Sequence, residues 1–377
     1  MEPKIRFKGF EGEWKTSTIG EIAPLQRGYD LPTNNVISGT IPVVYSNGIL
    51  RFHNEGKCQA PAIITGRSGT IGKFTYIDHG EYWPHNTSLW VTTFHKNYPR
   101  FVYYFFQNVG FEKYATGSGV PTLNRNDIHK HIESIPSNKE EQQAIASYFT
   151  TLDSQISAST SRLASLKQMK AASLQAMFPQ EGETVPKIRF KGFEGEWKKV
   201  KADSIFKTFN EKNRPDLPVL SAAQDRGMVT RESIGYNIFH DTSNEATYKH
   251  ILPGQFVIHL RSFQGGFAHS EIEGIASPAY TIIDFKNKDL YHDYYWRYVF
   301  MSKEFIKRLE LITYGIRDGR SISYDEFKEM SFLVPSKEEQ IKIASYLKNL
   351  DRQISLQSQR LEKLKQIKSA CLDKMFV

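Results

Sequence analysis

The stretch of this sequence that comes nearest to a catalytic motif is the glycine-rich segment GRSGTIGKF, at residues 66–74. A phosphate-binding loop needs glycines at a fixed spacing, then a lysine, then a Ser or Thr whose hydroxyl binds Mg²⁺. Here the glycine spacing differs, and Lys73 is followed by Phe74. The related segment LRSFQGGF, at residues 260–267, has no lysine. Both segments therefore predict a turn-rich loop between strands, in which the glycines let the backbone approach a ligand closely.

Other side chains that could perform catalysis or hold a metal ion form no recognisable pattern. The sequence has no G-x-S-x-G, no H-E-x-x-H and no cysteine–histidine spacing typical of zinc. His129 and His131 lie two residues apart, which favours surface positions on a strand over metal ligands. The two cysteines, Cys58 and Cys371, are expected to be reduced thiols, and Cys371 is expected to pack in a core. The sequence thus predicts no catalytic residue and no metal ligand.

The chain does contain side chains suited to reading DNA bases, and they gather near predicted turns. Arginine is the natural bidentate partner of guanine, Asn and Gln pair with adenine, and Lys and Arg also neutralise phosphates. The pair Arg67-Ser68 recurs as Arg261-Ser262, and GIRDGRS at residues 315–321 places two arginines in a loop flanked by glycines. The predicted DNA-binding residues are Arg27, Arg67, Ser68, Lys73, Asn86, Arg125, Asn126, Arg226, Arg261, Ser262, Gln264, Arg317 and Arg320.

Two internal repeats organise the elements that must position these residues. The segment PKIRFKGFEGEWK, which we call the frame, occurs at residues 3–15 and again, letter for letter, at residues 186–198. A second repeat of about forty residues begins KEEQ at Lys139 and again at Lys337. Between a frame and the next long repeat lies a block that differs between the two halves. A period of this kind fixes the architecture before any local assignment.

The long repeats are predicted to be helices, because they contain no Gly or Pro and keep a seven-residue apolar period. A proline, a serine and then two glutamates precede or open each copy, as suits a helix start and its dipole. We favour an antiparallel pair within one chain over the alternative, a coiled coil between two chains. The apolar seam is predicted at Ile145, Phe149, Leu152, Ile156, Leu163 and Leu166, and at Ile343, Leu347, Leu350, Ile354, Leu361 and Leu364.

The variable blocks are predicted to be strand-rich α+β domains. Short β-branched runs such as AIITG and QFVIHL predict strands, and aromatic stretches at residues 101–115 and 294–310 predict helices. The expected domains are a first recognition domain at 1–138, a helix at 139–178, a second recognition domain at 179–336 and a helix at 337–377. The expected fold is therefore two similar α/β domains and two long helices, related by a pseudo-two-fold axis.

Charge alone does not identify a nucleic-acid-binding segment in this chain. The net charge is +8, distributed as +3 over residues 1–138, +1 over 139–178, zero over 179–336 and +4 over 337–377. A positive chain invites a DNA partner, but the balance requires local patches or help from another subunit. No apolar run is long enough to predict a membrane span, and a cytoplasmic location is expected.

The doubled pattern of frame, variable block and long helix resembles the specificity subunit of type I restriction–modification systems. The matching stretches are the frame itself, the helix starts IPSNKEEQQAIASYF and VPSKEEQIKIASYL, the GRSGTIGKF loop and TLNRNDI at residues 122–128. The resemblance implies that each block reads one half of a bipartite double-stranded DNA target. It also implies docking of two methyltransferase subunits and, in the full complex, restriction/translocase subunits. S-adenosylmethionine, ATP and Mg²⁺ are then expected on those partners and no cofactor on this chain.

Two other classes of function remain as alternatives at this point. A stand-alone DNA-modifying or DNA-cutting enzyme with duplicated DNA-binding modules would need acidic metal ligands or a cofactor-binding glycine motif, and the sequence has neither. A coiled-coil adaptor without DNA would not need the Arg- and Gly-rich loops found in both blocks. Because half-sites mirror protein symmetry, two unlike blocks on equal frames predict an asymmetric target.

Overall fold

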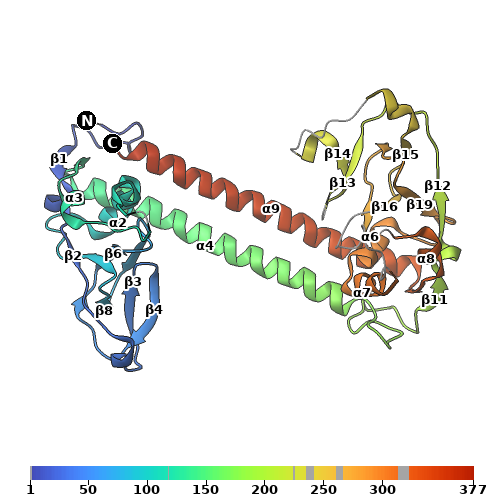
Figure 1. The fold of residues 1–377 in the computed structure, drawn as a ribbon, viewed down its shortest axis with the longest axis horizontal. Helices are drawn as coiled ribbons and strands as arrows, with labels where there is room; N and C mark the ends of the chain where they lie inside the picture. Colours follow the sequence, from blue (N-terminus) through green and yellow to red (C-terminus); the bar gives the residue numbers. More distant parts are fainter. Residues whose placement is uncertain (1, 118, 224–225, 235–241, 260–265, 313–321) are drawn as a thin grey trace. The chain divides into compact units, whose positions relative to one another are not determined.

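The computed structural model describes residues 2–117, 119–223, 226–234, 242–259, 266–312 and 322–377. The chain divides into two compact units (Figure 1). The first unit comprises Met1–Ser161 and Gln359–Val377, and the second comprises Arg162–Ser358. The two long helices, α4 (Lys139–Ala176) and α9 (Lys337–Met375), each contribute one part to each unit. Both helices lie where the seven-residue period predicts them.

The first unit is built on two four-stranded sheets and a closing strand pair. One sheet has the order β2-β9-β6-β7, the other β4-β3-β8-β5, and β1 pairs with β10. Helix α2 packs on β6 and β7. The bounds of these elements are β1 Lys15–Thr18, α1 Ile19–Ile22, β2 Leu25–Arg27, β3 Ile41–Tyr45, β4 Gly48–His53, β5 Cys58–Gln59, β6 Ala62–Gly66, β7 Phe74–Ile77, β8 Glu81–Pro84, β9 Ser88–Val91, α2 Pro99–Val109, α3 Arg125–His129 and β10 Ile132–Ile135.

The second unit repeats the central sheet with different side chains. Its strand order β12-β19-β16-β17 has the same topology as β2-β9-β6-β7, and β11 pairs with β20 as β1 pairs with β10. The bounds are β11 Lys198–Lys201, α5 Ala202–Ile205, β12 Phe206–Phe209, β13 Leu220–Ala223, β14 Gly227–Thr230, β15 Lys249–Ile251, β16 Phe256–Ile258, β17 Phe267–His269, β18 Gly274–Ala276, β19 Thr281–Phe285, α6 Asp293–Met301, α7 Lys303–Ile312, α8 Tyr324–Glu329 and β20 Ser331–Val334. The expected similarity of the two domains is confirmed at the level of topology.

One aromatic stretch predicted to be a single helical segment forms two helices. Helix α6 ends before Ser302, whose backbone is extended, and α7 begins at Lys303. The Ser302 hydroxyl accepts a hydrogen bond from the Phe305 amide at 3.2 Å, as an N-cap does. The predicted strands around residues 62–66, 88–91, 256–258 and 281–285 are present, and the loop at residues 66–74 joins β6 to β7.

The frame holds each unit to a helix start through a buried ion pair. In the first unit, Arg6 donates to both carboxylate oxygens of Glu141, at 2.7 and 2.9 Å, and the Trp14 indole donates to the same carboxylate. In the second unit, Arg189 donates to Glu339 at 2.7 and 2.8 Å. A bidentate arginine–carboxylate pair is both strong and directional. The repeated letters of the frame therefore correspond to a repeated physical contact.

The frame also contacts the end of the other long helix. In the first unit, the Ile5 amide donates to the carbonyl of Lys374 in α9, at 2.9 Å. In the second unit, the Ile188 amide donates to the carbonyl of Ala176 in α4, also at 2.9 Å. Phe376, which follows α9, packs in the first unit against Trp14 and Phe149. Each unit thus combines a frame with the start of one helix and the end of the other.

The two long helices pair in opposite directions within each unit. In the first unit, Lys368 donates to Asp153 at 2.6 Å. In the second, Lys170 lies 2.6 Å from the Asp351 carboxylate. The predicted seam residues of both helices lie at buried or half-buried positions. The fold expected from the sequence, two mixed α/β domains with an antiparallel helix pair inside the chain, is confirmed.

Candidate nucleic-acid interface

A basic hollow lies on the first unit, where the ends of several elements meet. It has a volume of about 660 Å³, and three arginines line it from three separate parts of the chain: Arg27 at the end of β2, Arg67 after β6 and Arg125 at the start of α3. The other lining residues are Gln26, Gly28, Tyr29, Asp30, Leu89, Thr122, Leu123 and Asn124. The hollow therefore brings together three of the side chains predicted to bind DNA.

The sheet order explains why these arginines converge. Strands β2 and β6 flank β9 and both pair with it antiparallel, so they run in the same direction and their last residues lie at the same edge of the sheet. Gly28, the residue after β2, lies against the backbone of residues 84–85. A larger residue would not fit there, because an added Cβ would stand 2.2 Å from the His85 carbonyl oxygen. Beyond β6, the Arg67 amide donates to Thr87 at 2.8 Å. Backbone contacts thus fix where each arginine leaves the sheet.

The segment that leads into α3 is attached to the segment after β6 by main-chain hydrogen bonds. The Leu123 amide donates to the carbonyl of Arg67 at 2.7 Å, and Ser68 forms a strand-like bridge with Thr122. Asn124 then starts α3, because its side chain accepts from the Asn126 amide at 3.0 Å. This cap places Arg125 in the first turn, at the edge of the hollow.

His129 links α3 back to β2, contrary to its predicted position on a strand. It ends α3, half-buried, and its Nε2 accepts a hydrogen bond from the Leu25 amide at 2.8 Å. Burial, with a contribution from Arg125, lowers the pKa of His129. His131 is also no free surface residue, since its ring lies 2.9 Å from the Tyr114 hydroxyl and 2.7 Å from Glu133. The alternation of the two histidines suggested a strand, but the Asn124 cap starts a helix instead.

The remaining predicted residues of the first unit fall into two groups. Ser68, Asn86 and Asn126 contact the lining: the Asn86 carbonyl accepts from Arg67 at 3.2 Å, and its side-chain amide donates to Asp30. Lys73 lies apart from the hollow, because its ammonium group donates to the Asn47 carbonyl at 2.6 Å. Asp30 and Tyr29 also line the hollow and were not among the predicted residues.

In the second unit, one predicted residue can be placed. Arg226 is exposed beside β14, and its guanidinium group donates to the Ser233 carbonyl at 3.4 Å. The predictions for Arg261, Ser262, Gln264, Arg317 and Arg320 lie outside the described residues. These five positions stay predictions from the sequence.

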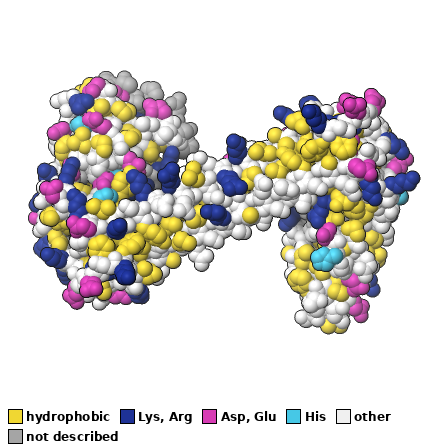
Figure 2. Space-filling model, turned by 180° about the vertical axis from the view of Figure 1, so that it is seen from behind, with side chains coloured by type: hydrophobic (Ala, Val, Ile, Leu, Met, Phe, Trp, Pro, Cys, Tyr) yellow, Lys and Arg dark blue, Asp and Glu magenta, His cyan; other side chains and the backbone are white. Residues whose placement is uncertain are grey.

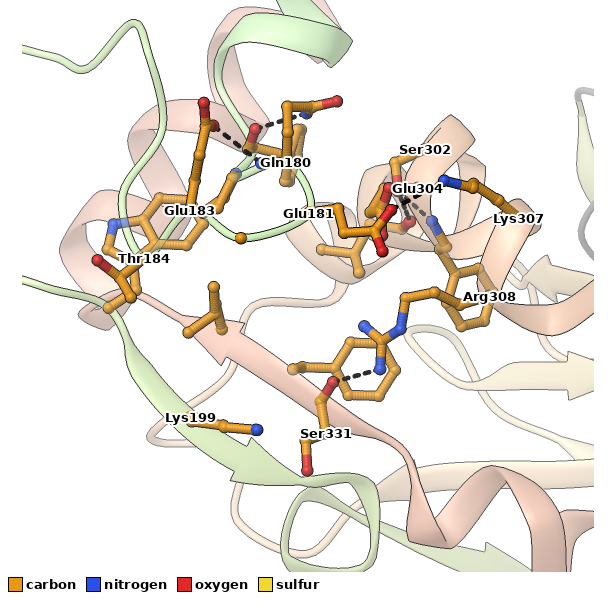
Figure 3. A pocket seen from close by; sticks show the side chains of 18 of the residues that line it. Gln180, Glu181, Glu183, Thr184, Lys199, Ser302, Glu304, Lys307, Arg308 and Ser331 are labelled. Atoms are coloured by element: carbon orange, nitrogen blue, oxygen red, sulfur yellow. Dashed lines mark hydrogen bonds and ion pairs between the residues drawn. The ribbon is translucent and has the colours of Figure 1, made fainter. Parts of the chain in front are cut away.

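A second hollow, of about 560 Å³, lies on the second unit beside α7 (Figure 3). It collects no residue that the sequence predicted to bind DNA. Two of its cations already have partners: Arg308 donates to the Ser331 carbonyl at 2.6 Å, and Lys307 donates to Glu181 at 2.9 Å. Its other lining side chains include the buried Trp197 and Tyr295. The hollow of the first unit is therefore the better candidate for an interface with DNA.

Neither sign of charge dominates the surface in view. On the face that Figure 2 presents, Lys and Arg side chains are interspersed with Asp and Glu on both units. In the described part of the chain, no three His, Cys, Asp or Glu side chains are arranged to hold a metal ion. Among the described helices, none has both the length and the apolar character needed to cross a membrane.

Comparison with known proteins gives the family directly. No curated protein sequence matches the chain. The family model described as "Type I restriction modification DNA specificity domain" matches it twice, at residues 11–168 and 194–366. The two matches cover the last residues of each frame, both variable blocks and most of both helices.

Solved structures show the same fold over the whole chain. The S subunit of a type I restriction–modification system from M. genitalium aligns with a TM-score of 0.69 and 16% identity, covering 100% of this chain and 99% of that one. A chain from a study of complex assembly and conformational transition in the type I R-M system aligns with a TM-score of 0.52 and 15% identity, covering 97% and 98%. The chain belongs to the family of type I restriction–modification DNA specificity proteins.

Proposed function

We propose that this chain is the non-catalytic specificity subunit of a type I complex and reads an asymmetric, bipartite double-stranded DNA target. Each unit reads one half-site. The observation that carries this proposal is the hollow of the first unit, where three arginines from distant parts of the sequence face one space. Arginine can donate two parallel hydrogen bonds to guanine and can also neutralise a phosphate.

The asymmetry of the target follows from what the two units share and what they do not. They share the central sheet topology and the frame contacts. They differ in the loops that leave the sheet, as the sequences of the two blocks show. Since specificity resides in the side chains that reach base edges, equal scaffolds with unlike loops support two unlike half-sites.

The repeated frame supports docking of two like partners, the methyltransferase subunits. Its exposed side chains are the same in both copies, including Lys8 and Glu11 in the first and Lys191 and Glu194 in the second. An identical surface presented twice suits two copies of one partner. We propose that S-adenosylmethionine binds to these partners, and ATP and Mg²⁺ to restriction/translocase subunits in a full complex.

Exchange of one variable block tests the proposal. A chain in which residues 16–135 come from a relative with another target is assembled with its methyltransferase subunits, and methylated sites are mapped by sequencing. One half-site should change and the other should remain, because each block has its own frame. A change of both half-sites would contradict the two-reader model. Methyl transfer from S-adenosylmethionine by the isolated chain would favour the stand-alone enzyme instead.

A further inference from the structure

One acidic side chain, Asp30, lines the basic hollow together with the three arginines. Asp30 lines the hollow beside Arg27, and 70% of its side chain is exposed. Its carboxylate lies 3.5 Å from the Arg27 guanidinium group and accepts a hydrogen bond from the Asn86 side chain. Asp30 therefore combines a fixed orientation with oxygen lone pairs that remain open to solvent.

The backbone around Asp30 holds it in this place. The Tyr29 amide donates to the Pro84 carbonyl at 2.8 Å, and the Trp83 indole donates to the Tyr29 carbonyl at 3.3 Å. On the other side, Leu31 is buried in a small apolar cluster with Trp83. Asp30 is thus presented between two anchored residues and cannot withdraw without breaking their contacts.

An exposed carboxylate at a DNA-binding surface has an electrostatic cost, because it repels the phosphates that the arginines attract. It also has no proton to donate at neutral pH, so it can only accept hydrogen bonds. In the major groove, the acceptors guanine O6, guanine N7 and thymine O4 would face it unfavourably. The major-groove donors are the amino groups of cytosine N4 and adenine N6, and in direct readout Asp and Glu characteristically accept from cytosine N4.

We propose that Arg27 and Asp30 together read one G·C base pair in the half-site of the first unit. Arg27 donates to guanine O6 and N7, and Asp30 accepts from the cytosine N4 amino group. The pair matches the donor and acceptor pattern of that base pair and opposes the reversed or substituted pairs. This inference rests on the proposed DNA-reading function and assigns Asp30 as a specificity-determining residue.

The test compares Asp30→Asn with the unchanged chain, each assembled with its methyltransferase subunits. Binding sites are selected from random duplexes and sequenced. The unchanged complex should enrich a bipartite motif with an invariant G·C pair in one half-site. In Asp30→Asn, the preference for cytosine over thymine there should fall about tenfold or more, because an amide can donate to thymine O4. The other positions should keep their preferences.

Asp78→Asn is the matched control. Asp78 is also an exposed partner of an arginine in the first unit, 3.2 Å from Arg100, but it lies outside the hollow. This variant should leave the motif unchanged. If Asp30→Asn instead kept every base preference and bound all sequences more tightly, Asp30 would merely balance the charge of Arg27, and the inference would be wrong. If the unchanged complex enriched no bipartite motif, the proposed function itself would fail.

Discussion

At the scale of single residues, Arg67 shows how a side chain of the hollow can be held by the protein and still have donors left for DNA. Arg67 has a backbone amide bonded to the Thr87 carbonyl and a guanidinium group bonded to the Asn86 carbonyl, so its position depends on the turn that joins β8 to β9. Only part of its donor set is occupied by that bond, since a guanidinium group has five N–H donors. The free donors can meet a base or a phosphate.

Two substitutions of Arg67 distinguish these partners. If Arg67 contacts guanine with two hydrogen bonds, Arg67→Ala should weaken specific binding by about 1–3 kcal/mol and relax one base position. Arg67→Lys keeps the positive charge but loses the planar pair of donors, so it should relax the same position nearly as much. Competition binding against single-base variants of the target measures both. If Arg67→Ala weakened binding to all sequences equally and Arg67→Lys restored it, Arg67 would contact a phosphate instead.

His129 makes the hollow sensitive to acid. Its Nε2 accepts the Leu25 amide proton, so the bond requires a neutral ring, and burial lowers its pKa from the usual 6.5. Between that lowered value and 6.5, the unfolded chain binds a proton at this site more readily than the folded chain does. The stability contributed by neutral His129 is therefore present above pH 6.5 and is lost as pH falls through the lowered pKa.

The corresponding experiment is urea unfolding of the wild type and His129→Gln across this pH range. The wild type should lose stability as pH falls below about 6.5, whereas Gln, whose amide oxygen accepts at any of these pH values, should lose less. Thermal unfolding at pH 7.5 serves as the control for general damage. An equal pH dependence in both proteins would show that other groups are responsible.

At the scale of elements, each long helix carries one carboxylate that contacts both a helix of its domain and the other long helix. In the first unit, the Asp153 carboxylate of α4 accepts from the Tyr104 hydroxyl of α2 at 2.9 Å as well as from Lys368 of α9. In the second unit, Asp351 of α9 accepts from the Tyr298 hydroxyl of α6 at 2.7 Å and pairs with Lys170 of α4. One carboxylate therefore ties three helices together in each unit.

This arrangement predicts coupling between substitutions. Asp153→Ala should destabilise the first unit by about 1–3 kcal/mol, because it leaves the largely buried Tyr104 hydroxyl without its strongest acceptor. In a Tyr104→Phe background, the same change should cost less, since the hydroxyl is already absent. Chemical denaturation of the four proteins gives the coupling. The parallel cycle with Asp351 and Tyr298 should give a similar value, and full additivity in both would contradict the shared contact.

The sequence predicts these helices well but the hollow poorly, and the reason is the range of the interactions. A seven-residue period without Gly or Pro is visible in any window of the helix. The convergence of Arg27, Arg67 and Arg125 depends instead on β2 and β6 both pairing with β9, which no local pattern reports. Asp30 was missed because a single acidic residue in a loop indicates no function until its neighbours in space, Arg27 and Asn86, are known. His129 was assigned to a strand because the local cap at Asn124 was not recognised.

At the scale of the whole molecule, the chain presents the same frame twice. Its exposed lysines, Lys8 and Lys191, stand at equivalent positions of the repeat, and the buried pairs Arg6–Glu141 and Arg189–Glu339 hold the two frames on their helix starts in the same way. If identical partners dock on the two frames, equivalent substitutions should have equal effects.

Partner counting tests this equivalence. Lys8→Glu alone, or Lys191→Glu alone, should reduce the number of bound methyltransferase subunits from two to one, and the double variant should bind none under the same conditions. Native mass spectrometry gives the count directly. Lys96→Glu, an exposed position of the first variable block, is the control and should leave two. Loss of both partners from one single substitution would show that the frames do not act separately.

The frame contacts also bear on how a variable block can be exchanged between genes. The residues that join a unit to the helices, such as Arg6, Trp14 and Glu141, lie inside the repeated segments or at helix starts that match between the copies. An exchange of one variable block between two genes, with crossovers in the frame and in the helix start, therefore leaves the contacts of Arg6 and Trp14 with Glu141 intact. Such an exchange would give the proposed complex a new half-site in one step, while the frame contacts keep their partners.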